Sequence, residues 1–287
     1  MTQQIDTLHR YLFDNYEVRG ELVQLQQSYQ QILASQDYPA PVQRLLGELL
    51  TATSLLTATL KFEGHINVQL QGDGPVSLAV VNGDNNQQLR GIARWEGELP
   101  DSDNLAELMG KGYLAITITP NDGERYQGIV ELSQGSLSKS IEDYFAQSEQ
   151  LKTRIWLFTD PEQEQPQCAG ILLQALPNAQ EGDFEHLEAL THTIKAQELL
   201  GLDAHEILYR LYHQDAVRVF DPQPVSFHCG CSREKCEQAL LQLGEAEATD
   251  VVTEVGKIEM NCDYCGQNYH FNPADVQNLF KTPPTIH

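Results

Sequence analysis

Two cysteine pairs near the C-terminus, Cys229-Gly230-Cys231 and Cys262-Asp263-Tyr264-Cys265, decide how the rest of this sequence is interpreted. Two thiols from each of two tight turns form the donor set of a closed tetrahedral zinc site. Gly230 and Gly266 supply the backbone freedom that such turns need. Four unrelated buried thiols are the alternative, but two tight pairs in a chain with six cysteines favour a metal. The sequence therefore predicts one zinc ion per chain, bound by Cys229, Cys231, Cys262 and Cys265.

The same four residues have a second chemistry. A Cys-x-Cys disulfide closes a small, strained ring, whereas a Cys-x-x-Cys pair forms a disulfide readily and is a familiar redox unit. The four thiols can therefore hold zinc when reduced and form two local disulfides when oxidised, Cys229 with Cys231 and Cys262 with Cys265.

The other candidate ligands and thiols are expected to have structural roles. Cys236 shares one face of a helix with three apolar residues, after a possible cap at Ser232, so it is interpreted as a core residue and not as a fifth ligand. His228 and His270 flank the pairs and could replace a sulfur, but four cysteines already complete the site. Cys168 precedes an apolar strand and is expected to be a buried, inert thiol.

Length and charge limit the possible functions. A chain of 287 residues can form one good core and a smaller appendage. The net charge of −23 disfavours binding to nucleic acid and favours solubility, although a generic acidic surface explains it equally well. The sequence shows neither a signal peptide nor an apolar run of about 18 residues, so we expect a cytoplasmic protein with reduced thiols and no membrane contact.

The first 176 residues are expected to form one α+β domain, an antiparallel sheet with packed helices. Apolar residues at helical spacing from Pro41 to Leu60 predict a long helix that packs across the sheet. Turn signals at Gly72-Asp73-Gly74, Asn82-Gly83 and Asn121-Asp122-Gly123 separate successive strands. The predicted strands cover residues 16–25, 66–70, 76–81, 113–119, 126–132, 154–158 and 169–176.

Two further segments follow this domain. A break at Pro177–Gly182 begins a helical linker, residues 177–226, whose two helices start at the candidate caps Asp183 and Asp203. Each helix is short and needs an apolar partner surface to be stable. Residues 227–287 then form a small zinc-binding domain.

The sequence contains neither a nucleophile elbow nor a His-Glu-x-x-His motif, and we expect a protein that is not an enzyme. Gly110-Lys111-Gly112 lacks the hydroxyl residue and the glycine spacing of a phosphate loop, and a turn is the better interpretation. Two alternatives for the cysteine domain remain open. A nucleic-acid-binding zinc ribbon conflicts with four basic residues against nine carboxylates in residues 227–287, a charge of −5. In a thioredoxin-like oxidoreductase the Cys-x-x-Cys opens a helix, whereas Gly266 and a strand-like run follow Cys265 here.

These cysteine segments, Cys229–Cys236 and Cys262–Gly266, resemble those of the redox-regulated heat-shock chaperones called the thirty-three kilodalton chaperonin family. The resemblance covers nearly the whole chain and extends to Asn15–Leu22, Leu55–Lys61, Ala93–Glu98 and Gly123–Gly128. It implies an ATP-independent holdase that binds unfolding client proteins under oxidative and heat stress. It also implies a zinc-bound inactive form and an oxidised active form that tends to form a homodimer. Residues 1–176 would then bind clients, and residues 227–287 would be the redox switch.

Overall fold

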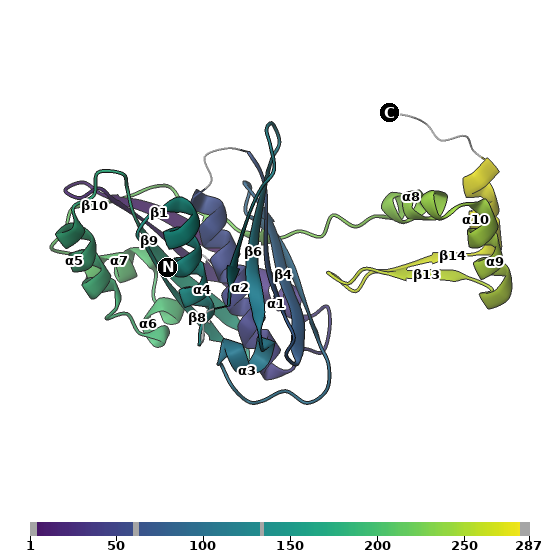
Figure 1. Ribbon diagram of the computed structural model, residues 1–287, viewed down its shortest axis with the longest axis horizontal. Helices are drawn as coiled ribbons and strands as arrows, with labels where there is room; N and C mark the ends of the chain where they lie inside the picture. The colour runs from purple at the N-terminus through teal and green to yellow at the C-terminus, as the bar shows by residue number, and fades with distance from the viewer. Residues whose placement is uncertain (1–4, 60–62, 133–134, 282–287) are drawn as a thin grey trace. The chain divides into compact units, whose positions relative to one another are not determined.

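The computed structural model describes residues 5–59, 63–132 and 135–281, and its chain forms two compact units. The first unit runs up to His228 and the second begins at Cys229 (Figure 1). Leu60, the last residue of the expected long helix, lies outside the described residues. No helix of the described segments is long and apolar enough to cross a membrane.

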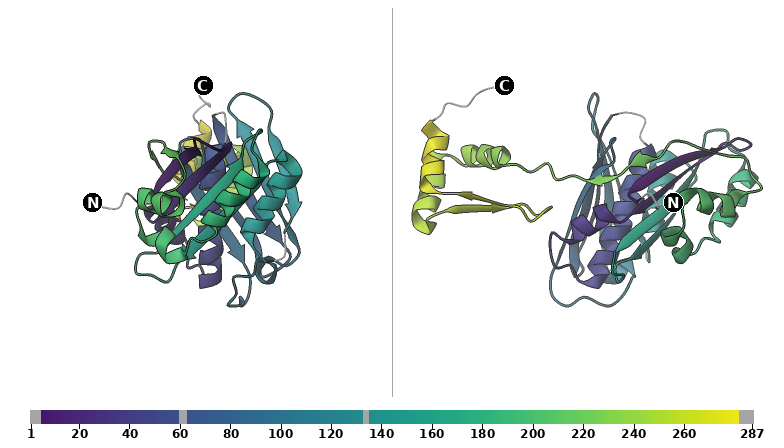
Figure 2. Two further views of the ribbon diagram at one scale, coloured as in Figure 1. Left: turned by 90° about the vertical axis from the view of Figure 1, so that its left-hand side faces the viewer. Right: turned by 180° about the vertical axis from the view of Figure 1, so that it is seen from behind.

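Two mostly antiparallel sheets form the frame of the first unit (Figures 1 and 2). In the described chain their strand orders are β10-β1-β2-β9-β8, with β11 also paired to β1, and β12-β5-β4-β3-β6-β7. The strands are β1 (Thr7–Phe13), β2 (Val18–Leu25), β3 (Gly64–Gly72), β4 (Val76–Asp84), β5 (Gln88–Trp95), β6 (Gly112–Pro120), β7 (Tyr126–Glu131), β8 (Thr153–Asp160), β9 (Gln167–Ala175), β10 (Val217–Val219), β11 (Gln223–Pro224) and β12 (Ser226–Phe227). The pairing of β12 with β5 is parallel. The predicted α+β class with an antiparallel sheet is confirmed.

The helix α2 (Ala40–Thr59) lies between the two sheets and is the centre of the larger core (Figure 1). Its buried residues occupy every side of the helix, and this is the pattern of a helix enclosed by protein. Gly47 allows close packing, because a Cβ there would come within 2.7 Å of Thr159 Cγ2 on β8. Smaller helical elements complete this part: α1 (Gln27–Leu33), α3 (Leu105–Met109), α4 (Leu137–Tyr144) and the π-helical turn η1 (Phe145–Glu149).

A second core covers the face of the first sheet that points away from α2. It joins the sheet to three linker helices, α5 (Glu181–Thr191), α6 (Ala196–Gly201) and α7 (Ala204–Tyr212). Phe184, Leu187 and Ile207 are almost completely buried against sheet residues such as Leu22 and Ile171. The linker helices therefore obtain the apolar partner surface that their short lengths require.

After α7 the chain forms an extended strap, residues 217–228, which holds on to both sheets. β10 and β11 pair with β1 of the first sheet, and β12 pairs with β5 of the second. Val225 is buried in the larger core, and the His228 backbone N–H donates a hydrogen bond to the Leu89 carbonyl. Residues 1–228 thus pack as one unit.

The second unit is small. It contains α8 (Arg233–Leu243), α9 (Glu245–Val255), a hairpin of β13 (Ile258–Asn261) and β14 (Asn268–Phe271), and α10 (Pro273–Lys281). Its buried apolar core consists of five residues among those described: Leu240, Ala248, Val252, Phe271 and Val276. Asn272 caps α10, because its Oδ1 accepts a hydrogen bond from the Asp275 backbone N–H at 2.9 Å.

Three local sequence predictions are wrong. The linker contains three helices and not two, because the short helix α6 lies between the two that were predicted. Asn82-Gly83 is not a turn but lies inside β4, where Gly83 permits close packing because a Cβ would meet Leu89 at 2.7 Å. The real turn follows at Asp84, whose carboxylate accepts hydrogen bonds from the backbone N–H groups of Asn86 and Gln88. Asp183 does not cap α5, since the N-cap position is Gln180. Asp203 does cap α7, through its hydrogen bond with the His205 backbone N–H.

Candidate metal centre

Two different local structures deliver the four cysteines. Cys229 and Cys231 lie just before α8, whose N-cap Ser232 accepts a hydrogen bond from the Lys235 backbone N–H. Cys262 and Cys265 lie in the turn between β13 and β14. All four belong to the second unit, although more than 30 residues separate the two pairs.

The four sulfur atoms form a compact cluster. They all lie within 4.8 Å of one another, and no disulfide joins them. The Sγ atoms of Cys229 and Cys262 are 3.5 Å apart, and those of Cys231 and Cys265 are 3.4 Å apart. A Zn–S bond of about 2.3 Å places tetrahedral sulfurs about 3.8 Å apart, so the cluster has the size of such a site.

Backbone groups support the sulfurs in both turns. The Cys231 amide hydrogen-bonds to the Cys229 thiol, and the Gln267 amide hydrogen-bonds to the Cys265 thiol. The second turn is closed by the Gly266 N–H, which donates to the Cys262 carbonyl at 2.8 Å. Gly266 has a φ of +69°, a backbone conformation that favours glycine, so the predicted role of this residue in the turn is confirmed.

Tyr269 on β14 contacts the sulfur cluster and was not predicted from the sequence. Its hydroxyl donates a hydrogen bond to Cys231 Sγ at 3.2 Å. This hydrogen bond is the main cause that lowers the pKa of Cys231 to about 7, while burial raises the pKa of Cys229. The one sequence feature that could have indicated this contact is the position of Tyr269, four residues beyond Cys265 on the strand that follows the turn.

The chemistry of this donor set fits a metal dication. Without a cation, the negative charge of one thiolate makes it harder to deprotonate the neighbouring thiols. Burial is the main cause that raises the pKa of Cys265 to about 12. A soft divalent cation bound by four sulfurs would stabilise all four thiolates together. The four cysteines are therefore close enough, and chemically suited, to hold one metal ion.

The other candidates are not part of this cluster. Cys236 lies on α8 and packs against the small core of the second unit, as predicted. His270 points to Glu259, with 3.2 Å between Nδ1 and the carboxylate, and His228 belongs to the first unit. Cys168 is buried in β9, and this burial raises the pKa of its thiol to about 12, so the predicted inert thiol is confirmed as buried.

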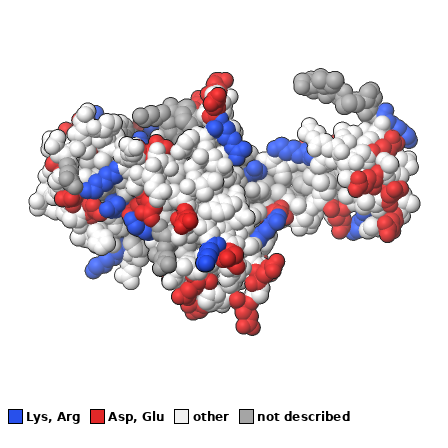
Figure 3. Space-filling view, in the orientation of Figure 1, with Lys and Arg blue, Asp and Glu red and all other residues white. Residues whose placement is uncertain are grey.

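The surroundings of the centre do not resemble either alternative site. Acidic side chains are spread over the visible face of the second unit, with few basic ones among them (Figure 3). A nucleic-acid-binding surface requires the opposite charge. Cys265 leads through Gly266 into β14 and not into a helix, so the Cys-x-x-Cys pair does not have the thioredoxin arrangement.

Fold and site together define an α+β protein with linker helices on one sheet and a small four-cysteine unit at its C-terminal end. Comparison with known proteins identifies the group. A family model described as "Hsp33 protein" matches residues 6–272, and the chain belongs to this family.

Similar proteins support this assignment over nearly the full length. The 33 kDa chaperonin of Aeromonas salmonicida (strain A449) is 63% identical over 282 residues, which are 97% of this chain and 96% of that protein. The 33 kDa chaperonin of Vibrio parahaemolyticus is 57% identical over 277 residues, 96% of this chain and 95% of that one. The crystal structure of the 33 kDa chaperonin from Thermotoga maritima has the same fold, with a TM-score of 0.86, 21% identity and coverage of 96% and 98%. The family is one of chaperones and not of enzymes.

Proposed function

We propose that this protein is a redox-regulated holdase, which binds unfolding proteins without ATP and prevents their aggregation. In the reduced form, Cys229, Cys231, Cys262 and Cys265 hold one zinc ion and the protein is inactive. Oxidation of these thiols activates it. The geometry of the four sulfurs, all within 4.8 Å of one another, carries this proposal.

The C-terminal unit is suited to a switch because its fold depends on few apolar contacts. Five buried apolar residues are too few to stabilise a domain of this size without additional restraint. Zinc, when bound, keeps the four sulfurs as thiolates and contributes folding free energy on the order of 10–16 kcal/mol. Loss of the sulfur ligands is therefore expected to unfold much of the unit.

The redox step consumes two equivalents of oxidant for each chain. For each disulfide, two thiolates would give up two electrons, and one peroxide molecule would take up these electrons and two protons from the solvent to form two waters. Hypochlorous acid would take up the same two electrons and one proton to form chloride and one water. The proposed products are the disulfides Cys229–Cys231 and Cys262–Cys265. The shortest sulfur–sulfur distances join the two pairs to each other, so this pairing rests on the local turns and the family resemblance. Mapping the disulfides by mass spectrometry after peroxide treatment would reveal cross-pairing if it occurs.

The client surface is proposed to be the face of the first sheet beneath the linker helices. Phe184, Leu187 and Ile207 cover apolar sheet residues there, and detachment of α5–α7 would expose both sides of this contact. Chain continuity couples this surface to the switch. The strap that follows α7 ends at His228, directly before Cys229, so unfolding of the second unit would begin at the residue next to the strap. Exposed apolar surface would also favour the homodimer that the resemblance implies.

A double variant, Cys262→Ser with Cys265→Ser, tests whether metal loss alone opens the client surface. It removes two ligands and one disulfide at once. We expect a zinc-free protein with an unfolded C-terminal unit and partial suppression of client aggregation even under reducing conditions, because no core contact replaces the lost metal energy. Cys168→Ser is the matched control and should retain zinc and remain inactive when reduced. A double variant that is inactive in every redox state would contradict the proposed mechanism.

A further inference from the structure

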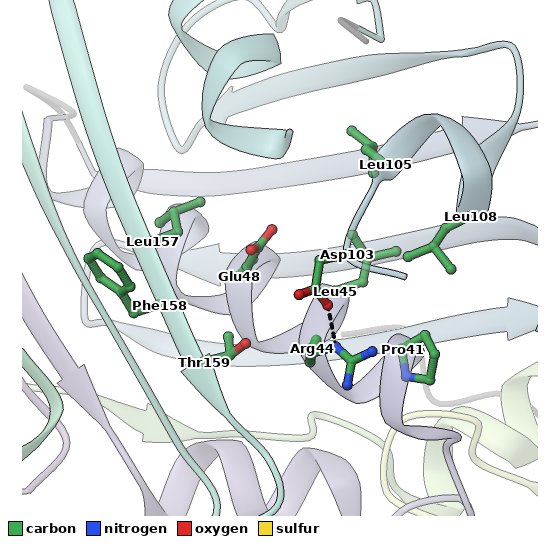
Figure 4. Close-up of a pocket in the computed structure, with 10 residues that line it drawn as sticks. All are labelled: Pro41, Arg44, Leu45, Glu48, Asp103, Leu105, Leu108, Leu157, Phe158 and Thr159. Atoms are coloured by element: carbon green, nitrogen blue, oxygen red, sulfur yellow. Dashed lines mark ion pairs between the residues drawn. The ribbon is translucent and has the colours of Figure 1, made fainter. Parts of the chain in front are cut away.

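A cavity of about 230 Å³ lies in the first unit between α2, α3 and β8, remote in sequence from the cysteines (Figure 4). Its apolar wall includes Leu45, Leu105 and Leu157, one from each of these three elements. Ligand pockets of proteins commonly measure about 300–1,000 Å³. The cavity is thus suited to one side chain or a molecule of similar size.

The carboxyl group of Glu48 is one of the polar groups that line this cavity. Glu48 comes from the middle of α2, and its side chain points into the space between the apolar walls (Figure 4). Among the described residues no hydrogen bond or ion pair is formed by this carboxyl group. Burial raises the pKa of Glu48 to about 7, and the nearby Asp103 raises it further, while Arg44 acts in the opposite direction. Glu48 is half-buried, and a carboxyl group in such a place is stabilised by a cationic partner.

Arg44 does not act as that partner, because its guanidinium is already occupied. It forms an ion pair with Asp103, a second with Asp101 at 3.0 Å and a third, longer one with Glu162 at 3.8 Å. The three carboxylates are largely exposed, so the arginine is held at the mouth of the cavity. Together with Glu48 the site has four carboxyl groups and one cation. A negative ligand would therefore be repelled, and a positive one attracted.

We propose that this cavity binds one ammonium or guanidinium group carried on a short aliphatic stem, the chemistry shared by a Lys or Arg side chain and a small alkylamine. The apolar wall would cover the stem, and Glu48 would pair with the charged head. A metal ion is a poorer ligand for this site. Among the described residues the cysteine cluster is the group with metal-ligating geometry, and Glu48 is not part of one.

Titration of the full-length, reduced, zinc-loaded protein with n-butylammonium chloride tests the proposal. Amide chemical shifts of Leu45, Glu48, Leu105 and Leu157 in ¹⁵N-labelled protein are the readout. We expect saturable shifts at these residues, and binding of n-butanol, which has the same stem without charge, about tenfold weaker or more. An equal concentration of sodium chloride should produce no such shifts. Equal binding of butanol, or no saturable change, would overturn the proposal.

Variants separate the role of Glu48 from general charge. Glu48→Gln keeps the shape and is expected to weaken n-butylammonium binding about tenfold, with unfolding temperature as a check of the fold. Asp101→Asn, at the exposed mouth, should change affinity by less than about twofold. Unchanged affinity in Glu48→Gln would overturn the assignment.

The two possible sources of the ligand can be distinguished with N-acetyl-lysine N-methylamide, which presents the same head on a peptide backbone. Binding of both probes assigns the cavity to protein side chains, and binding of the amine alone assigns it to small amines. Either result supports the cation site. If neither probe binds, the cation-site proposal is overturned. The redox-holdase proposal is then unaffected, because no part of it uses this cavity.

Discussion

Replacing Ile207 by Ala is expected to lower the barrier to activation, because this side chain holds α7 on the first sheet. Ile207 is 0% exposed and belongs to the core that joins the linker helices to the sheet. Truncation of such a residue typically costs about 2–5 kcal/mol. Since about 1.4 kcal/mol is a factor of ten in an equilibrium constant, the detached state of α5–α7 should become roughly 30- to 3,000-fold more populated.

Hydrogen exchange of residues 196–212, measured on reduced, zinc-loaded protein, reports this population directly. We expect faster exchange in Ile207→Ala, together with measurable suppression of client aggregation before any oxidant is added. Tyr209→Ala is the matched control: it lies on the same helix, is 70% exposed, and should change neither quantity appreciably. Faster exchange without a gain in aggregation suppression would show that the covered sheet face is not the client surface, and the reasoning would be refuted.

Three other predictions concern the thiols and a buried carboxyl. Cys229→Ser, Cys231→Ser, Cys262→Ser and Cys265→Ser should each sharply weaken binding of the one expected zinc ion, as measured by metal analysis. Cys168→Ser and Cys236→Ser should not weaken it. Full zinc retention in Cys231→Ser would contradict the four-sulfur site. Tyr269→Phe removes the hydrogen bond that stabilises the Cys231 thiolate, so zinc should be released faster to a chelator from the reduced variant than from the unchanged protein, and an equal release rate would argue against the hydrogen bond. Glu21 in β2 is buried, and burial raises its pKa from 4.5 to about 7, with Arg19 opposing this effect. At Glu21 the folded state therefore binds more protons than the unfolded one. The stability that Glu21 contributes is fully present below about pH 4.5 and is lost as the pH rises through about 7. Urea unfolding at pH 5 and pH 8 should show a loss on the order of 3 kcal/mol that is absent in Glu21→Gln, and equal losses in both proteins would contradict it.

Features encoded by local pattern could be predicted from the sequence. Apolar residues at helical spacing predicted the long helix α2, although not its burial on all sides, and the two cysteine turns predicted a common site because a metal requires their donors together. The cap at Asp203 and the left-handed Gly266 follow from the same short-range chemistry.

Features that depend on distant contacts could not be predicted. Asn82-Gly83 is typical of a turn, but the close approach of Leu89 and of α2 explains why glycine is required inside β4. The strap has little apolar periodicity and becomes ordered by pairing with β1 and β5. The hydrogen bond of Tyr269 could not be predicted because its partner, Cys231, is 38 residues away. The place of Glu48 in a cavity could not be predicted because α3 and β8, which are distant in sequence from α2, form the other walls.

The central claim, that sulfur oxidation opens the linker–sheet contact, is tested most directly on one sample before and after peroxide. Zinc content, hydrogen exchange of α5–α7 and suppression of client aggregation would be measured in parallel, followed by reduction and zinc addition. We predict that zinc loss, faster exchange of these helices and the appearance of activity occur together and are reversed together. Aggregation suppression that appears while α5–α7 remain as protected as in the reduced protein would contradict the account.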